Sequence, residues 1–172
     1  MVIRKIRNNS GSTIIIWLII ISLVFVLLSV FFIDFANLYM NNKKIKSSVN
    51  LAVKAASLQI KEDSQLASGN FNIDEIQAYE AFIKILTYNL NLDKITLEPL
   101  EYSILTEKPI IKEFEVINNT PNEYNSIILG NTFEVNNPSV FAVIEFKTKT
   151  MFINGDIRVD KLSSSQLTSI YE

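Results

Sequence analysis

A single uncharged apolar run, residues 14–33, constrains the fold of this chain more than any other feature of its sequence. The run reads IIIWLIIISLVFVLLSVFFI, and its only polar residues are Ser22 and Ser29. In a helix these residues rise about 30 Å, which is the thickness of the hydrocarbon core of a bilayer. A helix at the surface of a soluble domain has a polar side, which this run lacks. The run therefore predicts a transmembrane helix over residues 14–33.

The residues on either side of this run predict its orientation. Arg4, Lys5 and Arg7 make residues 1–13 a basic tail, which we expect in the cytoplasm. Three lysines follow the run and nearly balance that count: Lys43, Lys44 and Lys46. A secretory signal peptide has a similar layout, but its apolar region spans about 7–15 residues and ends at a small-residue cleavage site. We expect instead a retained single-pass anchor in the cell membrane, with a cytoplasmic N-terminus and an extracytoplasmic C-terminal domain.

Residues 34–62 are expected to continue the same helix as an amphipathic segment. Neither proline nor glycine interrupts the chain between Gly11 and Gly69. Apolar residues recur at helical spacing and define an apolar stripe: Leu38, Ile45, Val49, Ala52, Ala56 and Ile60. The stripe must pack on something, and two partners fit it equally well. One is the chain's own domain, and the other is the helices of neighbouring subunits.

Three residues mark the edges of the predicted span. Asp34 falls at the lipid boundary, where it either ends the apolar stretch or meets a positive charge on a neighbouring subunit. Trp17 and Tyr39 flank the span, as aromatic residues that anchor a helix at the headgroup layers do. Candidate assembly residues are therefore Asp34 and Tyr39, together with the apolar stripe.

The remaining residues, 63–172, predict one small α+β domain that begins with a second helix. Asn72 is the expected cap of this helix, with Glu75 three residues further on, and the helix should fade over residues 89–93. Its expected buried face consists of five residues: Ile76, Tyr79, Ile83, Leu86 and Leu90. A 172-residue chain with a membrane anchor has room for one such domain.

Alternating apolar residues after Lys94 predict an antiparallel β-sheet. The expected strands cover residues 95–97, 100–104, 110–117, 140–149 and 157–159. Asn154-Gly155 predicts the hairpin turn between the last two strands. From Ser163 onward the polar composition predicts a loosely held tail.

Composition argues against catalysis and against nucleic-acid binding. The chain has neither histidine nor cysteine, so the commonest general base, the commonest metal ligand and disulfide bonds are all missing. It has 16 basic and 18 acidic residues; three of the basic ones precede the span, so the remainder carries a net charge of −5. Glu113 and Glu115 share one face of a predicted strand, where they either bind calcium, act as an acid–base pair or line a solvated sheet face. We expect no enzyme activity, cofactor or metal.

A further pattern covers roughly the first 60 residues. A glycine precedes the apolar helix, and Asp-Phe-x-x-x-Tyr and an alanine-rich helix follow it, at Gly11, Asp34, Phe35, Tyr39 and residues 52–56. This pattern resembles the TadE/TadG-like minor pilins (pseudopilins) of tight-adherence, Flp-type pilus systems. The resemblance implies an envelope subunit with its C-terminal domain outside the cytoplasm, which helps to assemble or prime a surface pilus.

The N-terminus departs from the wider pilin pattern. Members that are cut by a prepilin peptidase carry a glutamate five residues after the glycine, whereas the residue five positions after Gly11 is Ile16. Processing between Gly11 and Ser12 and an intact N-terminus are therefore both open.

These features predict a structural, non-enzymatic subunit of a Flp or type IV-like pilus or of a related secretion machine. Its expected partners are the lipid bilayer and other pilin or pilus-assembly subunits. The alternative is a membrane-tethered extracytoplasmic binding or sensor module unrelated to pili.

Overall fold

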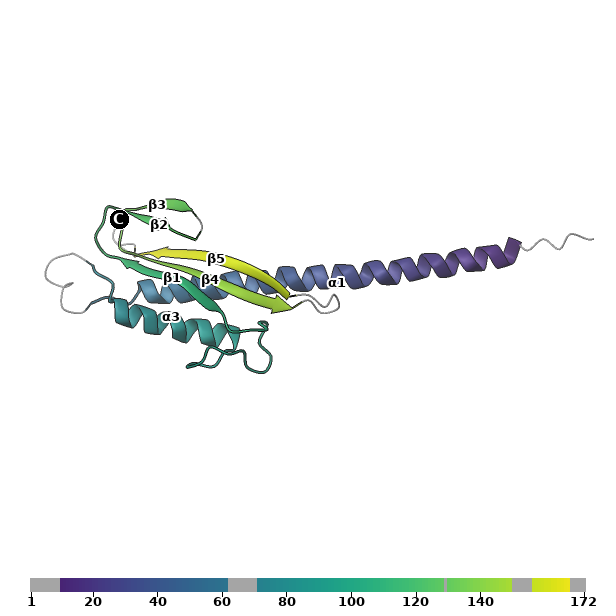
Figure 1. The fold of residues 1–172 in the computed structure, drawn as a ribbon, viewed down its shortest axis with the longest axis horizontal. Helices are drawn as coiled ribbons and strands as arrows, with labels where there is room; N and C mark the ends of the chain where they lie inside the picture. The colour runs from purple at the N-terminus through teal and green to yellow at the C-terminus, as the bar shows by residue number, and fades with distance from the viewer. Residues whose placement is uncertain (1–9, 62–70, 129, 150–155, 168–172) are drawn as a thin grey trace, which may run out of the picture.

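One long helix dominates the structure, a computed structural model that describes residues 10–61, 71–128, 130–149 and 156–167 (Figure 1). Helix α1 (Ser10–Ser57) contains 48 residues without a break. Its N-terminal half projects from one end of the domain, and its side chains are exposed: Trp17 is 61% exposed and Phe25 66% exposed. Within the described residues, this is one helix long and apolar enough to cross a membrane.

The C-terminal half of α1 belongs to the folded domain. Ile45, Val49, Ala52 and Ala56 are at most 1% exposed, so this part of the apolar stripe is buried. Helix α1 packs against a second helix and against two strands of the sheet. Of the two partners that the sequence allows for the stripe, the structure therefore places the chain's own domain against it.

The rest of the domain is a helix, a three-stranded sheet and a separate two-stranded hairpin. Their bounds are α3 (Glu75–Leu90), β1 (Ile110–Ile117), β2 (Asn122–Ser126), β3 (Asn131–Val135), β4 (Ser139–Lys149) and β5 (Asp156–Gln166). The larger sheet has the order β1-β4-β5 and is antiparallel throughout. Helices α1 and α3 cover one face of this sheet, and the β2–β3 hairpin lies beyond its other face (Figure 1). The predicted α+β layout, with a long helix, a second helix and antiparallel strands, is confirmed.

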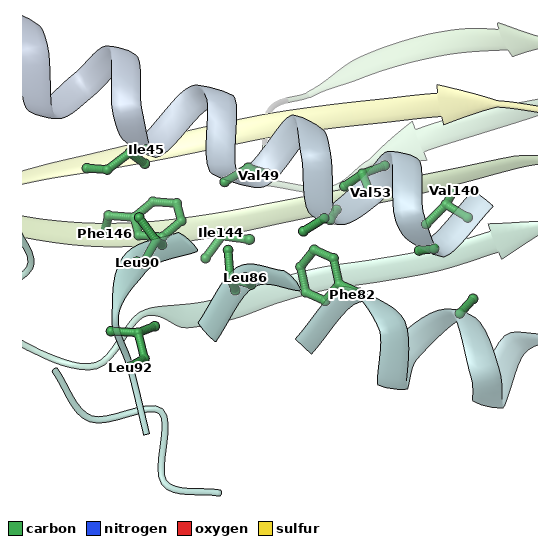
Figure 2. Close-up of a cluster of buried hydrophobic side chains, with 14 of the residues drawn as sticks. Ile45, Val49, Val53, Phe82, Leu86, Leu90, Leu92, Val140, Ile144 and Phe146 are labelled. Carbon is green, nitrogen blue, oxygen red and sulfur yellow. The ribbon is translucent and has the colours of Figure 1, made fainter. Parts of the chain in front are cut away.

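The main core lies between the two helices and the inner face of the sheet. Val140, Ala142, Ile144 and Phe146 alternate along β4 and are all buried, as the sequence predicts. They meet Leu86 and Leu90 of α3 and the buried side of α1 (Figure 2). The ring of Phe82 lies 5.0 Å, centre to centre, from that of Phe114 on β1.

A second, smaller core lies on the outer face of the sheet. It consists of Ile117, Tyr124, Val135 and Phe141. The Tyr124 ring stacks on that of Phe141 with 4.1 Å between their centres. Strand β4 is therefore apolar over part of both faces, because the β2–β3 hairpin covers its outer side.

A side-chain amide joins the backbone segments at the end of the domain that is opposite the projecting half of α1. Asn118 Nδ2 donates to the carbonyl of Ile73 at 3.0 Å, and the N–H of Ile73 donates to Asn118 Oδ1 at 2.7 Å. Ile73 also bridges to Ile60, just past the end of α1. These bonds join the segment before α3 to the end of β1 and to α1.

Two predicted strands, over residues 95–97 and 100–104, are wrong. Residues 91–109 form a loop instead, and Leu97 and Tyr102 have φ values of 61° and 70°, which a strand cannot contain. The expected tail is also wrong, since β5 continues to Gln166. Ser163 Oγ donates to Asn50 Oδ1 at 2.8 Å, which holds this end of β5 against α1.

The second helix is confirmed, but its cap and part of its buried face differ from the prediction. Asp74, not Asn72, caps it by accepting hydrogen bonds from the N–H groups of Ile76 and Gln77, both at 3.0 Å. The buried residues are Ala78, Phe82, Leu86, Thr87 and Leu90. Ile76 is 74% exposed, so it lies outside the side of α3 that faces the core. The predicted turn at Asn154-Gly155 lies outside the described residues.

Phe82→Ala should lower the free energy of unfolding by about 3–5 kcal/mol, because it leaves a cavity among fully buried side chains. The measurement is urea unfolding of the full chain in detergent micelles, followed by circular dichroism. Ile76→Ala on the same helix is the matched control, with an expected change within about 0.5 kcal/mol. Equal effects of the two substitutions would contradict this packing.

Candidate functional site

The uncovered half of α1 is the largest apolar surface of the described chain. Exposed fractions of its large apolar side chains run from 46% at Ile20 to 66% at Phe25, on every side of the helix. Monomeric soluble proteins rarely expose an apolar patch of this size. Lipid or other apolar helices are surroundings that suit such a surface.

A short polar seam separates this apolar half from the buried core. Asp34 is 1% exposed, while its neighbours Ile33 and Phe35 are 47% and 64% exposed. Asn37 and Asn41 follow Asp34 on the same side of the helix, and both are half-buried. The chain itself covers Asp34. Its two expected roles, ending the apolar stretch and meeting a positive charge on a neighbouring subunit, stay predictions.

Asn41 joins α1 to the end of the sheet. Its Nδ2 atom donates to Thr148 Oγ1 at 3.5 Å, and Thr148 Oγ1 donates to the carbonyl of Ile104 at 3.1 Å. Asn41 lies eight residues past Ile33, a rise of about 12 Å. The folded domain thus begins directly beyond the apolar half of α1.

Tyr39 differs from the other predicted assembly residues because it points outward. Tyr39 is 65% exposed and Phe35, four residues earlier, is 64% exposed, so the two rings form an aromatic pair of positions on the outside of α1. Leu38 is half-buried, and Ile45, Val49, Ala52 and Ala56 are inside the domain. Phe35 is part of the pattern that resembles the minor pilins. In the sequence, only its spacing of four residues from Tyr39 indicates that the two side chains lie on one exposed side of the helix.

Gly11 and Ser12 lie in the first turn of α1. The structure describes their backbone as helical, and processing between them stays a prediction.

Glu113 and Glu115 lie on the outer face of the sheet, as their alternation predicts, but only Glu115 is exposed. The Glu113 carboxylate accepts hydrogen bonds from Tyr124 Oη at 2.5 Å, Ser126 Oγ at 2.9 Å and the N–H of Ile128 at 3.1 Å. Partial burial raises the pKa of Glu113, yet the hydrogen bonds from Tyr124 and Ser126 outweigh it and leave the pKa below its usual value. Burial and this carboxylate together raise the pKa of Tyr124. Glu113 thereby ties β1 to the β2–β3 hairpin, a structural role.

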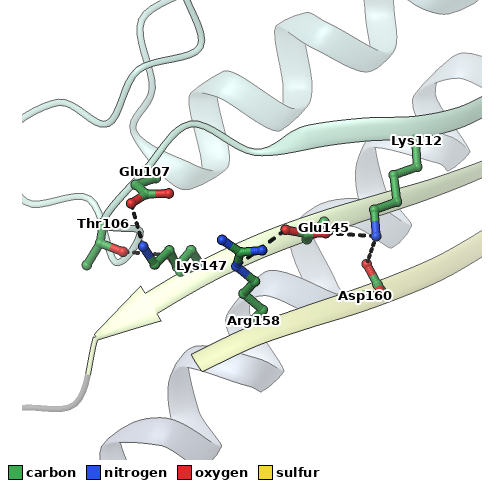
Figure 3. Close-up of polar contacts among 7 residues, drawn as sticks. All are labelled: Thr106, Glu107, Lys112, Glu145, Lys147, Arg158 and Asp160. Carbon is green, nitrogen blue, oxygen red and sulfur yellow. Dashed lines mark hydrogen bonds and ion pairs between the residues drawn. The ribbon is translucent and has the colours of Figure 1, made fainter. Parts of the chain in front are cut away.

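Ion pairs connect β1, β4, β5 and the loop before β1 (Figure 3). Lys112 Nζ lies 2.7 Å from Glu145 Oε2 and 2.9 Å from Asp160 Oδ1, and these hydrogen bonds raise the pKa of Lys112. Lys147 Nζ lies 2.5 Å from Glu107 Oε1. Lys112 thus pairs with residues of β4 and β5, and Lys147 pairs with a residue of the loop before β1.

Within the described ranges, no group of three or more His, Asp, Glu or Cys residues is arranged to hold a metal ion. Of the two glutamates considered as an acid–base pair, Glu113 is bonded to the hairpin and Glu115 is exposed. The arrangement instead defines a chain whose apolar helix continues into a small α+β domain. No family model, curated protein or solved structure matches this chain.

Lowering the pH should destabilise the hairpin through Glu113. Because the folded-state pKa is lowered from 4.5, the stabilisation is fully present above that value and is lost as the pH falls through the folded-state pKa. We expect Glu113→Gln to be less stable at neutral pH and to lose less stability on acidification. Thermal unfolding of the full chain in micelles, from neutral pH to about pH 3, measures both effects.

Glu115→Gln removes a charge from the same strand and face and is the matched control. An acid dependence that is the same in Glu113→Gln and in the unmodified chain would contradict this role.

Proposed function

We propose that this chain is a single-span envelope protein that acts as a minor pilin-like or assembly subunit of a Flp or type IV-like pilus or a related secretion machine. The N-terminus would lie in the cytoplasm and the α+β domain outside. The observation that carries the proposal is the continuity of α1, whose first half is an uncovered apolar rod and whose second half forms part of the core.

This continuity suits assembly for a mechanical reason. A core packed to native density does not allow one of its helices to slide, so any displacement of the apolar rod carries the domain with it. A tethered domain on a flexible linker would lack this coupling. The uncovered rod can exchange lipid for the apolar helices of other subunits, because lipid tails and apolar side chains are similar surroundings for it.

The outward aromatic positions add support. Phe35 and Tyr39 belong to the pattern that resembles the TadE/TadG-like minor pilins, and both are about two-thirds exposed just beyond the apolar rod. They are therefore available to a neighbouring subunit, whereas most of the apolar stripe is not. In this proposal lateral contacts run through the rod and this pair.

A membrane-tethered binding or sensor module is the second candidate. It is favoured by the burial of Ile45, Val49, Ala52 and Ala56. These residues of the apolar stripe belong to the chain's own core, so they are not available to a neighbouring subunit. Such a module would act as a monomer.

Single cysteines distinguish the two candidates, since the chain has none of its own. Phe35→Cys and Tyr39→Cys should form crosslinks to neighbouring subunits in native membranes, because both positions face outward next to the rod. Lys54→Cys, exposed on the same helix further from the rod, is the matched control and should give weak crosslinks. Crosslinks that are absent at all three positions would favour the monomeric module.

Deletion of the gene, followed by imaging of surface filaments, tests the biological role. We expect filaments to be lost or reduced and to return with the unmodified chain. Normal filaments and adhesion would contradict a role in pilus assembly.

A further inference from the structure

Residues 91–109, which we name the junction loop, lie at the end of the domain nearest the apolar rod. Thr106 N–H donates to the carbonyl of Lys147 at 3.0 Å, and Leu105 bridges to Thr148. Thr148 is in turn the partner of Asn41 on α1. These contacts place the base of the junction loop about 12 Å beyond the apolar run.

The junction loop is held by its own hydrogen bonds. Asp93 Oδ1 accepts from the N–H groups of Ile95 and Thr96, at 2.9 and 2.8 Å, and the N–H of Asp93 donates to the carbonyl of Glu98 at 2.9 Å. Ser103 Oγ donates to the carbonyl of Leu90 at the end of α3, at 2.7 Å. The backbone of the loop is thus a defined structure, which fixes the positions from which its exposed side chains project.

This ordered loop exposes apolar and aromatic side chains to an unusual degree. Ile95 is 91% exposed, Tyr102 is 86% exposed and Leu100 is 49% exposed. Tyr102 also has a φ of 70°, a left-handed conformation that a bulky residue rarely adopts. A fold that packs Leu92 and Leu105 inwards and yet keeps Ile95 and Tyr102 outside leaves them free to contact something else.

A basic groove adjoins the loop. It is a shallow hollow where α1 passes the end of α3, lined chiefly by Met40, Lys43, Lys44, Ser47, Leu51 and Asn89. Asn89 is two residues before the junction loop begins. Apolar walls beside two lysines form a surface that suits both the acyl edge and the phosphate of a lipid headgroup.

We propose that the junction loop and the basic groove make a second contact with the bilayer, in which Ile95 and Tyr102 enter the headgroup layer and Lys43 and Lys44 meet anionic lipid. The α3 side of the domain then contacts the membrane surface. This inference rests on the membrane anchor in the proposed function, but not on pilus assembly.

The dimensions allow this contact. The headgroup layer adds about 5–7 Å beyond each side of the hydrocarbon core, and transmembrane helices tilt by about 20° on average. A tilt toward the α3 side lowers the loop from its height of about 12 Å toward this layer. Tyrosine is a residue that favours the headgroup region. The loop itself is net acidic, with Lys94 and Lys108 against Asp93, Glu98, Glu101 and Glu107. The apolar side chains and the groove lysines therefore supply the attraction.

The test places an environment-sensitive fluorophore on Ile95→Cys in the full chain, in vesicles of phosphatidylcholine alone or of equal parts phosphatidylcholine and phosphatidylglycerol. We expect a blue-shifted emission and quenching by headgroup-level spin-labelled lipid, both stronger in the anionic vesicles. Two matched controls carry the label on equally apolar, exposed isoleucines. Ile76→Cys lies on the same side of the domain at its far end, and Ile127→Cys lies on the β2–β3 hairpin.

The controls should show neither effect, and Tyr102→Ser should weaken the signal from position 95. Lys43→Gln with Lys44→Gln should remove the difference between the two vesicles, whereas Lys54→Gln should leave it. Emission and quenching at position 95 that match those of the controls in both vesicles would overturn the proposal and point to a protein partner for the loop. Resistance to alkaline carbonate extraction reports separately on the anchor, so its failure is distinguishable from that of the loop contact.

Discussion

The structure depends on one helix that keeps its backbone hydrogen bonds while its surroundings change. A helix satisfies its own N–H and C=O groups, which is the condition for crossing hydrocarbon, and α1 meets it over its apolar half. The same unbroken helix then supplies Ile45, Val49, Ala52 and Ala56 to the core. The apolar half of α1 and the domain are therefore joined by one continuous helix rather than by a linker.

Polar residues lie on the inner side of α1 where its surroundings change from the uncovered apolar half to the core of the domain. Asp34 is covered by the chain, and Asn41 bonds to Thr148 at the end of β4. Further along, Ser57 and Ser165 hydroxyl groups lie 2.9 Å apart, and Ser163 bonds to Asn50. Small hydroxyl side chains on β5 let the strand approach the helix closely. Polar contacts thus hold the edges of an interface whose centre is apolar.

Strong periodicity allowed much of the fold to be predicted, and weak periodicity did not. The apolar run, the stripe on α1 and the alternation in β4 each repeat over several positions, so one face is specified unambiguously. Residues 95–104 also alternate, but over two short pieces, and the hydrogen bonds of Asp93 and Ser103 favour a loop there. Ser163 and Ser165 were predicted to belong to a tail, because no local pattern shows that small side chains are required where β5 packs against α1. For the candidate site, the exposure of Tyr39 and the burial of Asp34 followed only from the tertiary structure.

The sequence by itself determined that this chain has an apolar helix long enough for a bilayer and an α+β domain, because these properties follow from residues near one another along the chain. Only the tertiary structure decided which side of α1 is buried, that Glu113 holds the β2–β3 hairpin, and that Ile95 and Tyr102 stay outside near the apolar rod. Those outcomes depend on contacts between residues far apart in sequence. Such contacts are set by how the layers pack, which no local pattern contains.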